Sequence, residues 1–217
     1  MKYICKFRFC GTCRIFNKCA SDRDIFIKYS DDVGDADMIY EEKSVSSDII
    51  FDGRIVKLRV DKVLMPGGRV TTREIVGHPG GVGIVAVTDN DEIILVRQYR
   101  KPIEKAIYEI PAGKLDPGEH HRACGIRELE EETGYTAQGF EYLGFMYPSP
   151  GFTDEVTHVY LAEDLQEGEC HPDEGEFLEI EKIPAEKVFD MVMSGEINDA
   201  KSVFGILKYM AIRNKTK

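Results

Sequence analysis

The chain has 217 residues, 42% hydrophobic and 31% charged, a balance typical of a folded globular protein rather than a disordered or fibrous one. Its net charge of −11 argues against long nucleic acids as partners, because an acidic surface repels the phosphate backbone. No apolar run is long enough to cross a bilayer, and Met1–Arg8 lacks the apolar segment of a signal peptide. We therefore expect one main cytoplasmic domain with appendages and no membrane partner.

Residues 1–37 differ in composition from the rest of the chain. They carry four of the six cysteines and end in an acidic run at 31–37. Only Cys10 and Cys13 have the close spacing of a zinc-binding pair, so a structural zinc site is not favoured. We predict that residues 1–37 are a dispensable, poorly ordered extension or a product of start-site choice, and that a chain beginning at Met38 keeps full activity.

The next segment alternates apolar and polar residues with the period of a β-strand. Residues 55–64 and 70–76 show this pattern on either side of a turn at Pro66-Gly67-Gly68. The pattern predicts an antiparallel N-terminal sheet. We assign residues 38–78 to this sheet region and residues 79–217 to the catalytic domain.

The catalytic domain alternates predicted strands and helices. Two apolar runs at 83–87 and 92–96 flank the polar residues 88–91 and indicate a buried hairpin. A helix is predicted from about Glu119 to Thr133, where Gly134 ends it. Further strands are expected at 107–110, 140–146, 156–162 and 177–180, and further helices at 185–193 and 200–212.

The predicted helix at 119–133 carries the chemistry. At 100° per residue, Glu128, Glu131 and Glu132 share one face, and Ala123, Ile126 and Leu129 lie on the opposite side. Like charges at this spacing repel, and a divalent cation removes that penalty. Hard carboxylate oxygens suit Mg²⁺ or Mn²⁺, which also bind phosphate oxygens.

The segment GKLDPGEHHRACGIRELEEETGY, residues 113–135, resembles the Nudix box at every fixed position, with Tyr135 in the final aliphatic place. The resemblance implies an α+β fold, an α/β/α sandwich with a mixed sheet, and Mg²⁺-dependent hydrolysis of a pyrophosphate, with Mn²⁺ as a substitute. It also implies that Glu119 and Arg127 form an ion pair. The structural positions of the box are Gly113, Glu119, Arg127 and Gly134.

Four further segments resemble the ADP-ribose pyrophosphatase branch of this family. They are residues 73–76 together with 78–80, residues 96–102, residues 109–113 and residues 149–155. In that branch a proline about sixteen residues beyond the box marks ADP-ribose specificity, and Pro150 lies sixteen residues after Gly134. The resemblance implies hydrolysis of ADP-ribose to AMP and ribose 5-phosphate.

Carried over by position, the resemblance also assigns individual roles. The backbone carbonyl of Ala112 would bind metal with Glu128 and Glu132, and Glu131 would assist. Arg100 would bind a phosphate. The fixed fork of donors in a guanidinium group suits this role better than the single ammonium group of a lysine. Arg73 and Glu74 would line the adenosine end, Ser149 the terminal ribose, and Lys114 would add a further substrate contact.

The catalytic base is expected outside the helix, in the acidic loop 171–177. Such a composition is typical of a mobile lid. Glu176 matches the family's loop glutamate best, and Glu174 is the alternative. His120, His121 and His158 are expected to have no catalytic role, because two abut the helix start and one lies in a strand.

Two other functions are less compatible with the sequence. A Nudix fold without catalysis can sense nucleotides, but such proteins usually lose box glutamates, and all are present here. Another nucleoside diphosphate sugar or a dinucleoside polyphosphate is the alternative substrate. In related enzymes the N-terminal strands cross a two-fold interface, so we expect a homodimer in which Arg73 and Glu74 act on the partner's site.

Overall fold

The computed structural model describes residues 41–171 and 177–216. The predicted extension 1–37 and the two candidate bases, Glu174 and Glu176, lie outside these residues. Across the described ranges, every helix is too short or too polar to span a bilayer.

The first three strands form an antiparallel sheet in the order β1-β2-β3. They are β1 (Lys43–Asp52), β2 (Lys57–Leu64) and β3 (Val70–Gly77). The turn between β2 and β3 needs positive φ angles, which Gly67 (92°) and Gly68 (88°) adopt without a steric penalty. This sheet confirms the predicted N-terminal antiparallel sheet.

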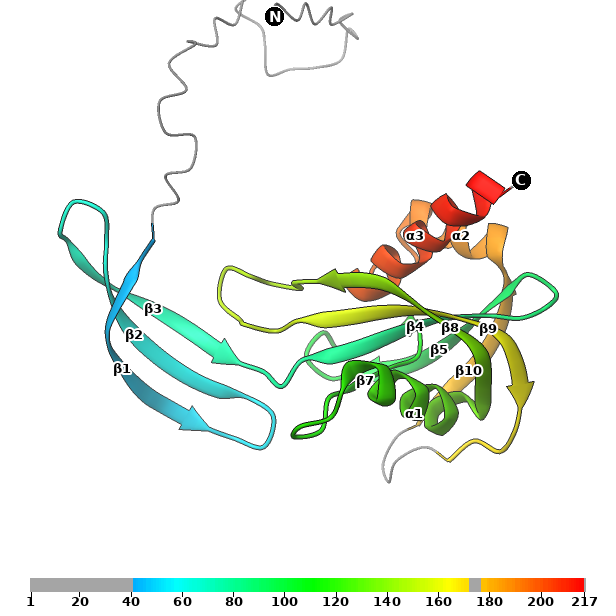
Figure 1. Ribbon diagram of the computed structural model, residues 1–217, viewed down its shortest axis with the longest axis horizontal. Helices are drawn as coiled ribbons and strands as arrows, with labels where there is room; N and C mark the ends of the chain where they lie inside the picture. Colours follow the sequence, from blue (N-terminus) through cyan, green and yellow to red (C-terminus); the bar gives the residue numbers. More distant parts are fainter. Residues whose placement is uncertain (1–40, 172–176, 217) are drawn as a thin grey trace, which may run out of the picture. The chain divides into compact units, whose positions relative to one another are not determined.

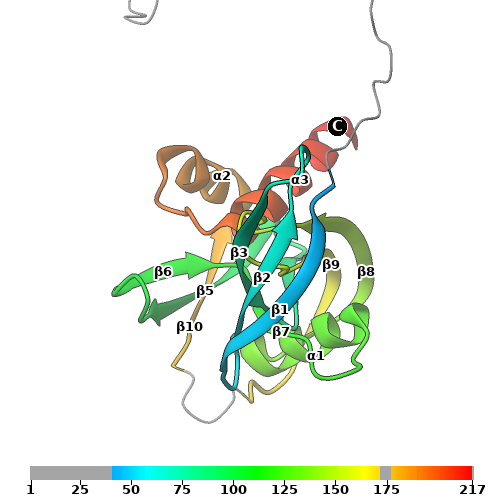
Figure 2. The same cartoon turned by 90° about the vertical axis from the view of Figure 1, so that its left-hand side faces the viewer.

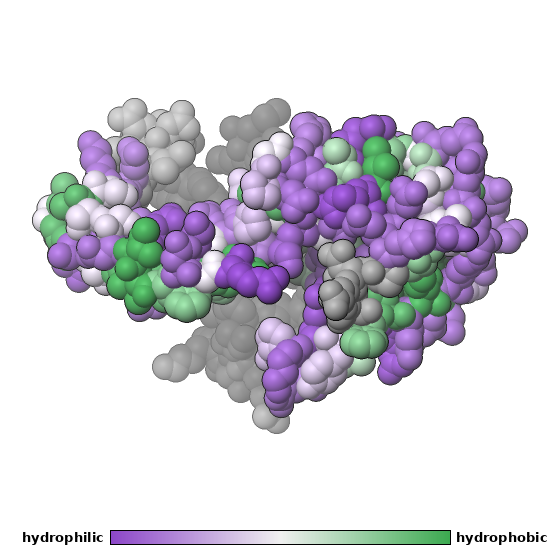
Figure 3. Space-filling model, turned by 90° about the horizontal axis from the view of Figure 1, so that it is seen from below, coloured by the Kyte–Doolittle hydropathy of each residue, from purple (hydrophilic) through white to green (hydrophobic). Residues whose placement is uncertain are grey.

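The outer strand of this small sheet is unusually apolar for an exposed edge. All ten residues of β1 are exposed, including Val45, Ile49, Ile50 and Phe51. Figure 3 shows apolar side chains gathering on the surface of the three-stranded sheet. A long edge strand with exposed apolar side chains usually marks an interaction surface.

The remaining strands form a seven-stranded mixed sheet. Its main path runs β10-β5-β4-β9-β8, with β6 paired to β5 and β7 to β4. β4 and β9 are parallel, and the other pairs are antiparallel. The strands are β4 (Gly81–Val87), β5 (Glu92–Arg100), β6 (Lys105–Glu109), β7 (Ala112–Lys114), β8 (Tyr135–Met146), β9 (Thr157–Glu167) and β10 (Glu179–Pro184).

Helices cover both faces of this sheet (Figures 1 and 2). α1 (His121–Thr133) lies on one face, and α2 (Ala185–Ser194) and α3 (Ala200–Thr216) lie on the other. β4 is buried throughout, and its alternate side chains divide between two cores: Ile84 faces α1, and Val85 faces α2 and α3. The arrangement confirms the α/β/α sandwich with a mixed sheet.

The end of β3 is joined to the segment that follows β8. Val76 forms an isolated bridge with Thr153, and its N–H donates to the carbonyl of Phe152 at 2.8 Å. The N–H of His78 donates to Asp154 Oδ1 at 2.9 Å. The residues 149–155, singled out in the sequence for substrate choice, are therefore hydrogen-bonded to the strand that carries Arg73 and Glu74.

Candidate active site

The central helix α1 begins two residues later than expected and ends where expected. His120 caps its start, and its Nδ1 accepts from the N–H of Arg122 at 3.2 Å. Gly134 ends it with a φ of 74°, and its N–H donates to the carbonyl of Glu130 at 2.8 Å. A Cβ at Gly134 would lie 2.9 Å from the backbone nitrogen of Cys170, so only glycine fits this turn.

The side of α1 that packs on the sheet differs from the predicted apolar face. Leu129 is buried as expected, but Ala123 and Ile126 are exposed, and Cys124 and Gly125 are buried in their place. A Cβ on Gly125 would already lie 3.0 Å from the ring of Phe140. The helix therefore packs on the sheet through small residues. Hydrophobic periodicity does not predict this face, because glycine carries no apolar signal.

The close approach of α1 to β7 brings the predicted metal-binding groups together. The carboxylate of Glu128 lies against Gly113, where a Cβ would stand 1.8 Å from Glu128 Cδ. Glu132 is 3% exposed, and its Oε2 accepts from the N–H of Ala112 at 2.9 Å. Two helix carboxylates therefore border adjacent residues of β7, Glu132 at Ala112 and Glu128 at Gly113.

Arg127 forms hydrogen bonds with three glutamates in and just before α1. Its guanidinium forms a two-pronged ion pair with Glu119, both bonds measuring 3.0 Å, and its Nη1 also donates to Glu128 and Glu131. The hydrogen bonds from Arg127 are the main reason that the pKa of Glu119 falls to about 2. The hydrogen bond with Glu119 likewise raises the pKa of Arg127, so both groups stay ionised. The pair ties the loop before α1 to the middle of the helix.

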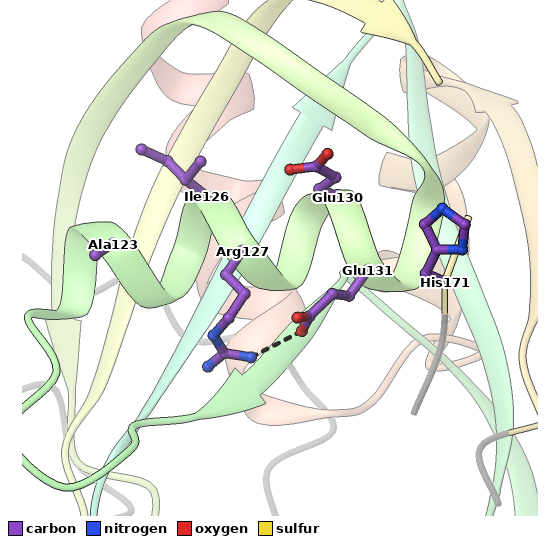
Figure 4. A pocket seen from close by; sticks show the side chains of 6 residues that line it. All are labelled: Ala123, Ile126, Arg127, Glu130, Glu131 and His171. Atoms are coloured by element: carbon purple, nitrogen blue, oxygen red, sulfur yellow. Dashed lines mark hydrogen bonds and ion pairs between the residues drawn. The ribbon is translucent and has the colours of Figure 1, made fainter. Parts of the chain in front are cut away.

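A hollow of about 570 Å³ lies along the outer side of α1 (Figure 4). Arg127 and Glu131 point to one side of the helix, and Ile126 and Glu130 point to the other. Gly113 and Glu128 are not among the residues that line this hollow. Its lining consists of Ala123, Ile126, Arg127, Glu130, Glu131 and His171.

The donor set beside β7 fits a hard divalent cation. Glu128 and Glu132 offer carboxylate oxygens, and Ala112 offers a carbonyl oxygen, the ligand type that Mg²⁺ prefers. Within residues 41–171 and 177–216, His, Cys, Asp and Glu side chains form no group of three able to hold a metal unaided. Glu128 and Glu131 both accept from Nη1 of Arg127, at 2.9 Å and 2.8 Å, so these two carboxylates lie on the same side of α1. Mg²⁺ tolerates such a set, because it keeps several waters and takes phosphate oxygens as ligands.

A second charged cluster lies at the end of β5 and was not foreseen from the sequence. Arg100 forms a two-pronged ion pair with Glu109, at 2.6 Å and 2.7 Å. Glu109 is 1% exposed and also pairs with Lys201 of α3, which in turn contacts Asp199 at 3.0 Å. Burial alone raises the pKa of Glu109, but Arg100 and Lys201 outweigh it and lower that pKa. The only sequence signal for this cluster is a glutamate at the buried end of a strand, directly before Ile110 and Pro111.

The residues predicted to contact substrate occupy several elements. Arg73 and Glu74 are neighbours on β3 and so face opposite sides of the small sheet. Arg73 pairs with Glu42, its Nε lying 2.8 Å from Glu42 Oε2, and Glu74 is exposed. Lys114 ends β7 with an exposed side chain, and Ser149 follows β8, its carbonyl accepting from the N–H groups of Phe152 and Thr153.

Three histidine rings stack beside the start of α1, apart from the carboxylates. The rings of His121 and His158 are 3.9 Å apart and nearly parallel, and His120 stacks on His121 at 4.3 Å. Nδ1 of His121 lies 2.5 Å from the hydroxyl of Tyr160, and Nδ1 of His158 lies 2.9 Å from that of Tyr142. Burial and the neighbouring imidazoles lower the pKa of His121 and of His158.

Comparisons with known proteins agree with this architecture. Residues 77–203 match the family described as NUDIX domain, and residues 42–76 match the Nucleoside diphosphate sugar hydrolase N-terminal domain. The chain is 46% identical to "ADP-ribose pyrophosphatase" of Bacillus subtilis, over 80% of this chain and 94% of the relative. It is 42% identical to "Methanol dehydrogenase activator" of Bacillus methanolicus, over 82% and 97%.

A solved structure described as "Crystal structure of ADP compounds hydrolase" shares the fold, with a TM-score of 0.73 and 22% identity. The superposition covers 81% of this chain and 96% of that one. The matched domain includes the whole loop and helix that bring Gly113, Glu128 and Glu132 together. The chain therefore belongs to the Nudix family of pyrophosphohydrolases.

Proposed function

We propose that the protein hydrolyses the pyrophosphate of ADP-ribose to AMP and ribose 5-phosphate, with Mg²⁺ as its cofactor. The observation that carries the chemistry is the contact of Glu128 with Gly113, which brings oxygen donors of α1 and β7 side by side. The choice of ADP-ribose is supported by Pro150 and by the 46% identity to a protein named for that activity.

Each group near β7 has a defined task in this proposal. Glu128, Glu132 and the carbonyl of Ala112 would hold the divalent cation, with Glu131 assisting. A cation bound there supplies positive charge to the phosphoryl oxygens and acidifies a bound water. Arg100 binds a phosphate of the diphosphate through the guanidinium donors that Glu109 leaves unused, and so orients the substrate for in-line attack.

The attacking water needs a base, for which we propose Glu176, with Glu174 as the alternative. The helix carboxylates suit this task less well. Glu132 is buried against the Ala112 N–H, and Glu131 is paired with Arg127. A base from outside α1 would leave both of these contacts in place.

We also propose a homodimer formed through the three-stranded sheet. The exposed apolar side chains of β1 supply a surface suited to a second copy of the chain. Arg73 and Glu74 lie on the same sheet and would complete the adenosine end of the partner's site. Glu42 holds Arg73 in place for that contact.

A substrate panel tests the proposed activity. Initial rates with Mg²⁺ would be measured for ADP-ribose, other nucleoside diphosphate sugars and dinucleoside polyphosphates. We expect the highest kcat/KM for ADP-ribose and no activity when the metal is chelated. A higher kcat/KM for another compound would reassign the substrate, and inactivity on all of them would favour a nucleotide sensor.

A further inference from the structure

We propose that Glu109 is a positioning residue that, held in place by Lys201, fixes the guanidinium of Arg100 at the phosphate end of the site. The proposal rests on the proposed function, in which Arg100 binds the diphosphate. It adds two residues, Glu109 and Lys201, that act on the substrate only through Arg100.

The geometry of the ion pair leaves Arg100 partly free for a ligand. Nε and Nη2 of Arg100 are both directed to Glu109, and this fork fixes the plane of the guanidinium. Among the described residues, Nη1 has no hydrogen-bond partner, and the Arg100 side chain is 41% exposed. One edge of the guanidinium is therefore anchored, and the other is available to an anion.

Lys201 supplies the second cation that the buried carboxylate needs. Its Nζ contacts Glu109 Oε2 and lies 3.0 Å from Asp199 Oδ2. Asp199 also caps α3, because its Oδ2 accepts from the N–H and the hydroxyl of Ser202. The ammonium group is thus held between Glu109 and the first turn of α3.

The same turn of α3 holds the metal-binding side of the site. Ser202 is fully buried, and its Oγ accepts from the N–H of Ile110 at 2.9 Å. Ile110 is the residue after Glu109 and stands two residues before Ala112, whose carbonyl is the proposed metal ligand. One short segment therefore carries both Glu109, which holds Arg100, and Ala112, the proposed metal ligand.

A stabilising role alone is a poor explanation for this cluster. A buried ion pair often contributes little net stability, because desolvation offsets the attraction. Here a carboxylate that is 1% exposed holds two cations, and one of them, Arg100, is 41% exposed. The pKa of Arg100 is raised mainly by its hydrogen bond with Glu109 and in part by the charge of Glu132 on α1. Displacing a substrate-positioning group by about 1 Å can cost on the order of a hundredfold in rate.

The test is a double-mutant cycle between Glu109→Gln and Arg100→Ala, measured as kcat/KM on the best substrate of the panel. We expect each single variant to lower kcat/KM by about 10- to 100-fold, with KM rising in both. In the Arg100→Ala background, Glu109→Gln should change kcat/KM by no more than about twofold, since the group it positions is absent. Effects that multiply, or an unchanged kcat/KM in Glu109→Gln, would overturn the proposal.

Two further variants keep the test decisive. Glu109→Asp retains the charge but withdraws the carboxylate, so it replaces Glu109→Gln in the cycle if that variant fails to fold. Glu179→Gln is the matched control, because Glu179 forms an exposed 3.1 Å ion pair with Arg97 on the same strand as Arg100. Its kcat/KM should equal that of the wild type. A wild-type protein inactive on the whole panel would instead refute the proposed function and leave the ion-pair geometry unaffected.

Discussion

Gly113 shows how one missing side chain shapes the candidate site. The Cα hydrogen in the position of a Cβ faces the Glu128 carboxylate, and the space between them is too small for a methyl group. β7 is held on its other side by pairing with β4, where Gly113 lies opposite Val82. Neither the strand nor the helix can retreat without breaking its packing on the sheet, so the fit is rigid.

We predict that Gly113→Ala abolishes activity, because the added methyl group must displace either the Glu128 carboxylate or β7. Activity should fall by about a hundredfold or more, since a shift of about 1 Å is enough for that loss. The matched control is Gly139→Ala on β8, where a Cβ would make an ordinary contact of 3.5 Å. Steady-state kinetics and thermal unfolding of both variants check this, and an active Gly113→Ala enzyme would contradict the assigned geometry.

Glu132→Gln tests the metal-binding role at a single atom. We expect turnover to fall by about a hundredfold or more at saturating Mg²⁺, because a neutral amide binds the cation poorly and metal-borne charge stabilisation is worth several kcal/mol. The amide oxygen still accepts from the Ala112 N–H, so circular dichroism should remain unchanged. Glu130→Gln, an exposed neighbour in the same run, serves as the control and should keep normal rates. Near-normal turnover in Glu132→Gln would refute the role.

At the scale of elements, local signals in the sequence were sufficient for most of the fold. Three local signals were enough to predict the elements beside them: the turn glycines 67 and 68, the alternation along β2 and β3, and Gly134 after α1. Each of these signals acts within a few residues. The prediction of which face of α1 packs on the sheet was partly wrong. Gly125 lies on that face because its small size allows close approach, and glycine gives no hydrophobic signal in the sequence. Pairing of Glu109 with Lys201 could not be predicted, because the partners are 92 residues apart and meet only through tertiary packing.

The stacked histidines beside the start of α1 predict a pH-dependent stability. Burial lowers the pKa of His121 and of His158, so the folded protein binds fewer protons than the unfolded chain around pH 6. The stability they contribute is present above the unfolded value of about 6.5 and is lost as pH falls through the lower folded values. Protonation also adds like charges to rings only 3.9 Å apart.

We therefore expect the Tm of the wild type to fall between pH 7.5 and about pH 5, and to fall less steeply in His158→Phe, which keeps the stacked ring but cannot take up a proton. His171→Gln is the control, because His171 is exposed and outside the stack. Thermal scans across this pH range provide the measurement. Equal slopes for wild type and His158→Phe would show that the stack does not titrate with unfolding.

For the whole molecule, the exposed edge of the small sheet predicts the state of assembly. We expect the mass of two chains by light scattering for the wild type, and of one chain for Ile49→Asp, which places a charge on an exposed apolar residue of β1. The monomeric variant should lose kcat/KM, because Arg73 and Glu74 would no longer reach a partner's site. Met193→Asp, at an exposed apolar residue of α2, is the control. A fully active monomeric wild type would contradict the shared site.

The most direct test of the account is identification of the products of ADP-ribose in the presence of Mg²⁺. Phosphorus NMR and chromatography of a completed reaction would be compared with a reaction in which the metal is chelated. We predict AMP and ribose 5-phosphate in equal amounts, formed only when Mg²⁺ is present, as expected for water attack on the pyrophosphate. Cleavage elsewhere in the molecule, or equal turnover without a divalent cation, would contradict the account.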